Sequence, residues 1–217
     1  MNKFLLILAL LTSITTKGQV TIIQKVKSFN GSVIEKYYVL NSNKEIKHGD
    51  YKRYYRSKLV AEGSYNHGEK EIFKYYYLND LPSVVYDYAH KKVLSYDKNE
   101  NYKDVYPLNG TEELIIDRPP LPLFSRYELE WFIANNIKYP TEAAENGQSG
   151  KVQILAVINE EGNITKYNLI SGVVQSLNRE ALRVVNLIPK EWKWIPAIRN
   201  GQPIESAIVL SVNFKTN

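Results

Sequence analysis

Apolar residues in the second half of the chain repeat with two different periods. Val152, Ile154, Ala156 and Ile158 fall on one face of an extended segment, which predicts a strand that is buried strongly on that face. The apolar residues of 177–188 follow a helical spacing, which predicts an amphipathic helix. Residues 160–163 form a polar turn that leads to a returning strand at 164–171, and a last strand is predicted at 206–215.

A further helix is predicted ahead of these elements. Ser125 and Glu128 have the spacing of a capping box, in which each side chain accepts a hydrogen bond from the other residue's backbone amide. This predicts a helix over 126–135, followed by one further turn at 141–145. The order helix, strand, strand, helix, strand predicts an α+β domain over residues 124–217, with two helices on one face of a three-stranded antiparallel sheet.

Aromatic residues dominate the first half of the chain. Fourteen of the 17 tyrosines fall between Tyr37 and Tyr106, and the pair His48-Gly49 recurs as His67-Gly68 before a second aromatic run. Aromatic runs bounded by Gly, Asn and Asp predict strands that are joined by tight turns. We therefore expect residues 19–108 to form an all-β module of successive hairpins in an open antiparallel sheet, with Tyr rings stacked along it.

The spacing of Gly and Tyr in this module resembles the MORN-like repeats of exported bacterial proteins. The resemblance implies a repeat module that carries no catalytic residue. A row of Tyr rings binds sugars or peptides by stacking where it is exposed, and packs the sheet where it is buried. Both interpretations of the Tyr-rich repeat remain open at this point.

The boundaries of the two modules carry their own signals. A basic start followed by the apolar run 4–11 is typical of a secretory signal peptide. We therefore expect residues 1–18 to be removed near Gly18-Gln19 and the protein to be periplasmic, or membrane-associated if this run stays uncleaved. Residues 109–123 contain a Pro-rich segment and are predicted to be a semi-rigid linker between neighbouring domains.

Composition and charge narrow the classes of function. The chain has 28 Lys and Arg against 23 Asp and Glu, mixed along both halves, which argues against nucleic-acid binding. It has no Cys, and therefore no thiolate ligand and no Cys nucleophile. We expect His48, His67 and His90 to lie along one edge of the repeats, too far apart to hold one ion. We predict no metal site and no cofactor.

Two pairs of carboxylates are candidates for acid–base chemistry, Glu128 with Glu130 and Glu142 with Glu145. Both pairs fall near predicted helix starts, where the helix dipole favours carboxylates. No His follows residue 90, so a Ser-His-Asp arrangement has no base in the second module. We predict no catalytic residue and expect that the protein is not an enzyme.

The second module also carries a series of short motifs in a fixed order. These are Tyr139-Pro140, Ala143-Ala144-Glu145-Asn146-Gly147, Gly150-Lys151-Val152, Glu161-Gly162-Asn163-Ile164, Glu180-Ala181-Leu182-Arg183-Val184-Val185, Trp194-Ile195-Pro196-Ala197, Asn200-Gly201-Gln202-Pro203-Ile204 and Val212-Asn213-Phe214. The series closely resembles the C-terminal domain of TonB energy transducers. The resemblance implies a periplasmic domain that binds TonB-dependent outer-membrane receptors by adding their plug-domain peptide to a sheet edge.

The last strand is the predicted binding edge, because no later segment of the chain follows to cover it. The resemblance implies that this strand takes the receptor peptide by strand addition. The predicted partner-binding residues are Ile208, Val209, Leu210, Ser211, Val212, Asn213 and Phe214. The alternative is a strand that completes the core or pairs with a second copy in a homodimer.

Two functions follow from these expectations. The first is a periplasmic TonB-like protein of outer-membrane transport that binds receptors or related envelope proteins. A full transducer of this family would have a membrane anchor that contacts motor proteins and a long Pro-rich arm. This chain differs from that pattern, because its N-terminal apolar run and its Pro-rich segment are both short. The second is a cell-envelope scaffold whose Tyr-rich repeat binds glycan or protein, without energy transduction.

Overall fold

The structure, a computed structural model, divides into two compact units that are described separately. Unit 1 consists of residues 1–98 together with 124–128, and unit 2 of residues 99–123 and 129–217. The residues that the structure describes are 13–16, 19–28, 32–76, 81–98, 105–106 and 116–215.

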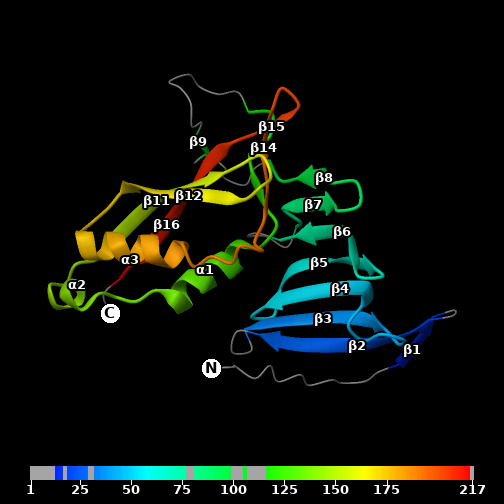
Figure 1. The fold of residues 1–217 in the computed structure, drawn as a ribbon. Coiled ribbons are helices and arrows are strands. Elements are labelled where there is room, and N and C mark those ends of the chain that lie inside the picture. Colours follow the sequence, from blue (N-terminus) through cyan, green and yellow to red (C-terminus); the bar gives the residue numbers. More distant parts are fainter. Residues whose placement is uncertain are drawn as a thin grey trace. The chain divides into compact units, whose positions relative to one another are not determined.

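Unit 1 is built on one antiparallel sheet in which each strand pairs with the next along the chain. Its strands are β1 (Ser13–Thr16), β2 (Gln19–Ser28), β3 (Val33–Leu40), β4 (Lys47–Tyr55), β5 (Lys58–Asn66), β6 (Glu69–Tyr75), β7 (Val84–Asp87) and β8 (Lys92–Tyr96). Their order in the sheet is their order in the chain, as the blue-to-green ladder of Figure 1 shows. The predicted sheet of successive hairpins is confirmed. The expected signal peptide, 1–18, lies outside the described residues except for β1.

A row of aromatic rings crosses one face of this sheet. Tyr37 stacks on Tyr51 with ring centroids 6.3 Å apart, and Phe73 follows at 5.5 Å from Tyr51. The strand between them contributes Gly63, which is paired with Tyr51 on one side and Phe73 on the other. The row is continuous because the glycine leaves room for a neighbouring ring.

The first turn of helix α1 (Arg126–Asn136) carries the predicted capping box. The amide of Ser125 donates to Oε2 of Glu128 at 2.9 Å, and the amide of Glu128 donates to Oγ of Ser125 at 3.2 Å. Glu128 is also ion-paired with Arg53, whose Nε lies 2.8 Å from Oε1 of Glu128 in a geometry bent away from a hydrogen bond. This carboxylate is therefore a capping and packing group.

Unit 2 contains a four-stranded sheet and the remaining helices. Its elements are β9 (Val105–Tyr106), β10 (Leu121–Pro122), α2 (Thr141–Glu145), β11 (Gly150–Ile158), β12 (Ile164–Ser171), α3 (Gln175–Val185), β13 (Trp194–Ile195), β14 (Ala197–Arg199), β15 (Gln202–Ile204) and β16 (Ser206–Phe214). The sheet order is β12-β11-β16-β9, with the first three strands antiparallel as predicted. The short β9, which the sequence did not indicate, adds a fourth strand.

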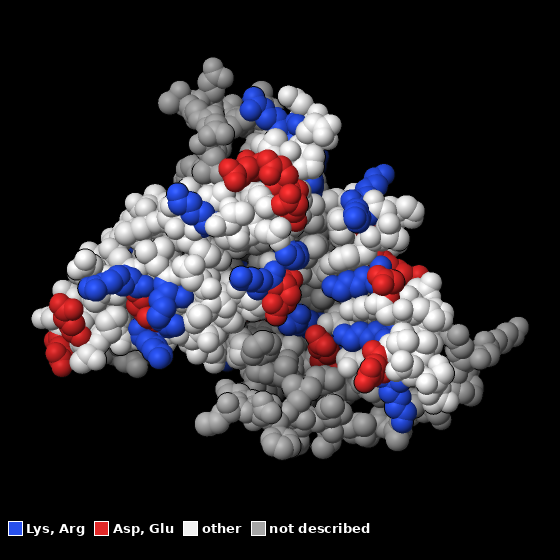
Figure 2. Space-filling view, viewed as in Figure 1, with Lys and Arg blue, Asp and Glu red and all other residues white. Residues whose placement is uncertain are grey.

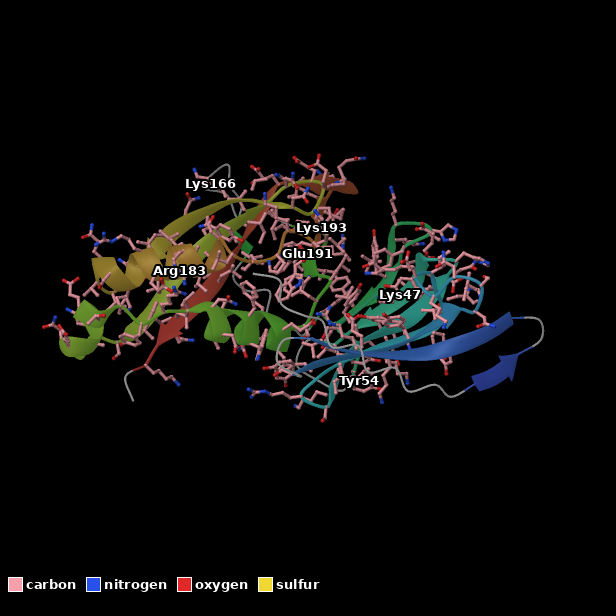
Figure 3. The ribbon with its side chains drawn as sticks, turned by 60° about the horizontal axis from the view of Figure 1, so that its bottom comes forward. Lys47, Tyr54, Lys166, Arg183, Glu191 and Lys193 are labelled. Atoms are coloured by element: carbon pink, nitrogen blue, oxygen red, sulfur yellow. The ribbon has the colours of Figure 1, made fainter. Side chains whose placement is uncertain are left out.

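Helix α3 packs on β11 and β12, and its apolar stripe is buried. Polar contacts connect α3 to the end of α1: Oε1 of Glu180 accepts the amide of Lys138 at 2.6 Å, and Arg183 donates to the carbonyl of Asn136 at 2.7 Å. The same Arg183 and Glu180 form an ion pair on α3. Figure 3 shows Arg183 on this helix. The α+β fold class is confirmed.

The Pro-rich segment belongs to unit 2 where it is described, over residues 116–123. Arg118 forms a bridge with Ile198, and β10 pairs with β13. Leu121 is fully buried. We expected a semi-rigid spacer. In the described part of the segment, Leu121, which lies between prolines, is part of the core, and the backbone pairs with later strands.

No helix within the described ranges is long and apolar enough to cross a membrane.

Candidate functional site

Strand β16 is the best candidate for a binding site, and its sequence explains why one of its faces is buried and the other is partly exposed. Along its length it pairs with β11, from Ser206 with Ile158 to Phe214 with Gly150, without interruption. Alternate side chains are buried, which fixes the register because a slip by one residue would expose them. The buried set includes Ile208, Leu210, Val212 and Phe214, whereas Ser211 and Asn213 are exposed.

The side of β16 that faces away from β11 is only partly covered. Strand β9 pairs there with the start of β16, Tyr106 with Ala207 and Val105 with Ile208. Among the described residues, no strand pairs with 209–214 on this side. We expected the whole of 208–214 to be free of later strands, and the structure adds that an earlier segment covers position 208.

The uncovered stretch ends in a hollow of about 450 Å³. Its lining residues are Ser149, Gly150, Lys151, Asn213, Phe214 and Lys215. Tyr139 supports one wall, because its ring meets the ring of Phe214 edge-on at 5.7 Å and its hydroxyl donates to the carbonyl of Gln148 at 2.5 Å. Lys151 falls within the motif Gly150-Lys151-Val152, but nothing in the sequence alone assigned it or Lys215 to a binding site.

The same sheet has a second edge at β12, on the side of that strand away from β11. Leu169 and Ile170 are exposed there by 43% and 51%, and Figure 3 shows Lys166 on the same strand. The pairing of β12 with β11 is irregular at two places, between Gln153 and Ile154 and again between Val157 and Ile158. Such irregularities twist an edge and disrupt regular strand pairing, so β16 offers the more regular edge.

The ring face of unit 1 is the other candidate, and it is largely filled by the unit's own side chains. Three tyrosine rings surround the ammonium nitrogen of Lys47. Their centroids lie 4.4, 5.0 and 5.2 Å away, at Tyr37, Tyr51 and Tyr65. Burial lowers the pKa of Lys47, against the opposing effect of the Glu35 carboxylate. Figure 3 shows Lys47 and Tyr54 on opposite faces of the sheet. This arrangement favours packing over an open stacking surface.

The histidines are placed differently from our expectation. His48 and His67 meet at adjacent turns with ring centroids 4.8 Å apart, and the amide of His67 donates to Nδ1 of His48 at 3.3 Å. The expectation that all three histidines lie far apart was wrong for this pair, because equivalent turns of successive hairpins are neighbours. His90 instead pairs with Asp87 at 2.8 Å. Within the described residues no three His, Asp or Glu side chains gather to hold a metal ion.

The remaining carboxylates are dispersed. Glu142 and Glu145 lie exposed on α2, and Glu130 is exposed on α1. Figure 2 shows basic and acidic side chains interspersed on the visible face. The chemistry that the geometry offers is therefore association through backbone groups at β16.

Comparison with known protein families places this candidate within a matched region. Residues 135–216 match the family described as Gram-negative bacterial TonB protein C-terminal. No curated protein matches the chain. The matched residues include α2, β11, β12, α3 and β16, and so contain the whole of the candidate edge.

Proposed function

Because residues 135–216 form a C-terminal domain of the Gram-negative TonB family, we propose that the chain is a periplasmic protein that binds outer-membrane receptors or related envelope proteins by strand addition. The observation that carries the proposal is the outer side of β16 over 209–214, which lacks a paired strand among the described residues. The partner contributes an extended peptide, and the two chains share a ladder of backbone hydrogen bonds.

The physical basis is the cost of leaving backbone groups unpaired. A strand edge presents amides and carbonyls that must bond to water or to another strand. Along β16 these groups are held in one register, because the pairing with β11 runs without a bulge from Gly150 to Ile158. A fixed register presents the partner with donors and acceptors at regular spacing, and so reduces the ordering cost of binding.

The side chains of β16 are suited to this role. The exposed side chains of Ser211 and Asn213 are polar, so these positions of the open stretch can be hydrated when no partner is bound. The buried Leu210 and Val212 hold the strand in the core. An incoming strand therefore gains backbone bonds without requiring the core to repack, as strand addition needs.

The alternative, an envelope scaffold whose Tyr-rich repeat binds glycan or protein, has less support. Phe73 is 1% exposed and Tyr51 6%, so the centre of the ring row lies within the core of unit 1. Lys47 and Lys70 lie over other rings of the row, at 4.4 Å from Tyr37 and 4.8 Å from Tyr88.

The proposal is tested with a peptide from the plug domain of a TonB-dependent receptor and the full chain. N-methylation removes one amide donor at a time and leaves the side chains unchanged, as proline does at sheet edges. In an added strand, successive amides point alternately toward and away from the neighbouring strand. We expect methylation at alternate positions to weaken binding about tenfold or more, and methylation between them to have little effect.

The positions at which methylation lowers the affinity decide whether the peptide binds by strand addition. A period of two in the measured affinities supports strand addition. Equal tolerance of methylation at every position, or failure of the unmodified peptide to bind the folded chain, would contradict it. Circular dichroism of the chain before the titration confirms that the protein used is folded.

A further inference from the structure

The hollow at the end of β16 contains two lysines that have no acidic partner among the described residues. Lys151 is the second residue of β11 and Lys215 follows β16, and both are exposed and line the hollow. Within the described residues, neither ammonium group has a carboxylate at ion-pair distance. Among the described residues, the end of the candidate edge therefore carries two positive charges that no carboxylate at ion-pair distance compensates.

The sheet geometry directs these groups toward the same place. Lys151 and Asn213 are cross-strand partners, so their side chains project from the same face. Lys215 follows Asn213 by two positions, which is the spacing of one strand face. Phe214, which is 3% exposed, also lines the hollow.

The two boundaries of the open stretch set where an added strand lies. At one end β9 occupies the outer side of β16 at Ala207 and Ile208. At the other end the pairing of β16 with β11 stops at Phe214 and Gly150, beside the hollow. Neighbouring strands lie about 4.8 Å apart. A residue of an added strand opposite Asn213 projects from the same sheet face as Lys151 and is therefore within side-chain reach of the hollow.

We propose that the hollow is a carboxylate subsite, which takes an acidic side chain at the end of the added strand through Lys151 and Lys215. The inference rests on the strand addition proposed above and defines the chemistry of the partner: an extended peptide with Asp or Glu at the terminal position that lies opposite Asn213. The side-chain amide of Asn213 supplies a further hydrogen-bond donor. Since the incoming group is a peptide, a carboxylate is the anion that it brings.

The expected contribution is modest, because both lysines are in water. Exposed ion pairs each change an affinity by about two- to fivefold, and salt screens them. The site therefore selects among peptides and orients them on the edge, while the backbone ladder supplies most of the affinity.

The experiment uses the full chain and three fluorescent peptides of alternating Val and Thr, with blocked termini. One carries Glu at its first position, one carries Glu at its last position, and one carries Gln at both. Binding is measured by polarisation at low and high salt. We expect one Glu peptide to bind about fivefold tighter than the Gln peptide at low salt, with the difference falling at high salt.

Charge-removing variants locate the effect. In K151Q and K215Q, the preference for that Glu peptide should fall about twofold each, while the Gln peptide binds unchanged. The matched control K166Q removes an exposed lysine from β12 and should change nothing. Equal binding of Glu and Gln peptides, or an equal effect of K166Q, would overturn the carboxylate subsite and leave strand addition standing. Failure of all three peptides to bind would overturn both.

Discussion

The ring of Phe73 occupies the space above Gly63 that any other residue's side chain would need. A β carbon built on Gly63 would lie 2.5 Å from a ring carbon of Phe73 and 2.6 Å from the carbonyl oxygen of Ile72. Phe73 is 1% exposed and contacts Tyr51, Tyr65 and Tyr88 through its ring. One glycine on β5 thus permits the central aromatic packing of unit 1.

We therefore expect Gly63→Ala to destabilise unit 1 by about 2 kcal/mol, because the methyl group forces the ring or the backbone to move. Urea unfolding followed by tyrosine fluorescence measures the change. The double variant with Phe73→Leu is the control, since the smaller side chain makes room for the methyl group. If the alanine costs as much in the Phe73→Leu background as in the wild type, the close approach is not its cause.

A second prediction concerns the ion pair of Arg53 with Glu128. Glu128→Gln keeps a capping residue but leaves the largely buried guanidinium of Arg53 with Glu35, at 3.8 Å, as its remaining ion-pair partner among the described residues. We expect a loss of about 2 kcal/mol in the free energy of unfolding. Glu145→Gln, on the exposed surface of α2, is the matched control and should change stability by less than about 0.5 kcal/mol. Equal effects of the two changes would show that the pair contributes nothing.

The tyrosines of unit 1 predict a loss of stability in alkali. Burial and the Glu35 charge raise the pKa of Tyr51, burial likewise raises that of Tyr65, and burial with a hydrogen bond to Glu62 raises the pKa of Tyr76 to about 12. Above the unfolded value of about 10, the unfolded chain releases protons that the folded chain retains, so stability falls as pH rises. Burial lowers the pKa values of Lys47 and Lys70, so the folded chain loses these protons at lower pH than the unfolded chain does. These two groups therefore raise stability as the pH rises toward the unfolded pKa of lysine.

Denaturant unfolding at pH 8 to 11, with tyrosinate absorbance recorded in parallel, measures this effect. We expect stability to be nearly level up to about pH 9.5 and to fall above pH 10. The contrary result is full tyrosinate absorbance near pH 10 with the folded circular dichroism spectrum retained.

The local parts of this fold could be predicted from the sequence, because their signals lie within a few residues. Ser125 and Glu128 identify a helix start through their spacing alone, and the structure has the helix at Arg126–Asn136. The apolar positions Val152, Ile154, Ala156 and Ile158 identify β11 in the same way. The capping box identifies a helix start and the apolar spacing a strand face, and both signals lie within a few residues of the chain.

Long-range pairings could not be predicted in this way. The pairing of Val105 with Ile208 joins segments that are distant in the chain, and two residues carry no periodicity. The meeting of His48 and His67 depends on how successive hairpins align, which their separation in sequence does not give. Leu121 is buried because its segment pairs with β13, although its prolines indicated a spacer. These contacts depend on tertiary packing.

The fragment 99–217 tests whether unit 2 is independent. It retains the β11–β16 pairing and the buried stripe of α3, so we expect it to fold alone. The first turn of α1, which groups with unit 1, should fray in the fragment. Backbone chemical shifts show both effects. A fragment without strand shifts over β11 and β16 would contradict the division.

Hydrogen exchange at the two sheet edges tests the central claim most directly. Amide exchange is measured in the full chain with and without the receptor plug peptide, comparing 209–214 of β16 with 164–171 of β12. We predict that bound peptide slows the exchange of alternate amides in 209–214, because only those that face outward gain a partner. Exchange along β12 should not change. Protection along β12, or none in 209–214 under saturating peptide, would contradict the assignment of β16 as the binding edge.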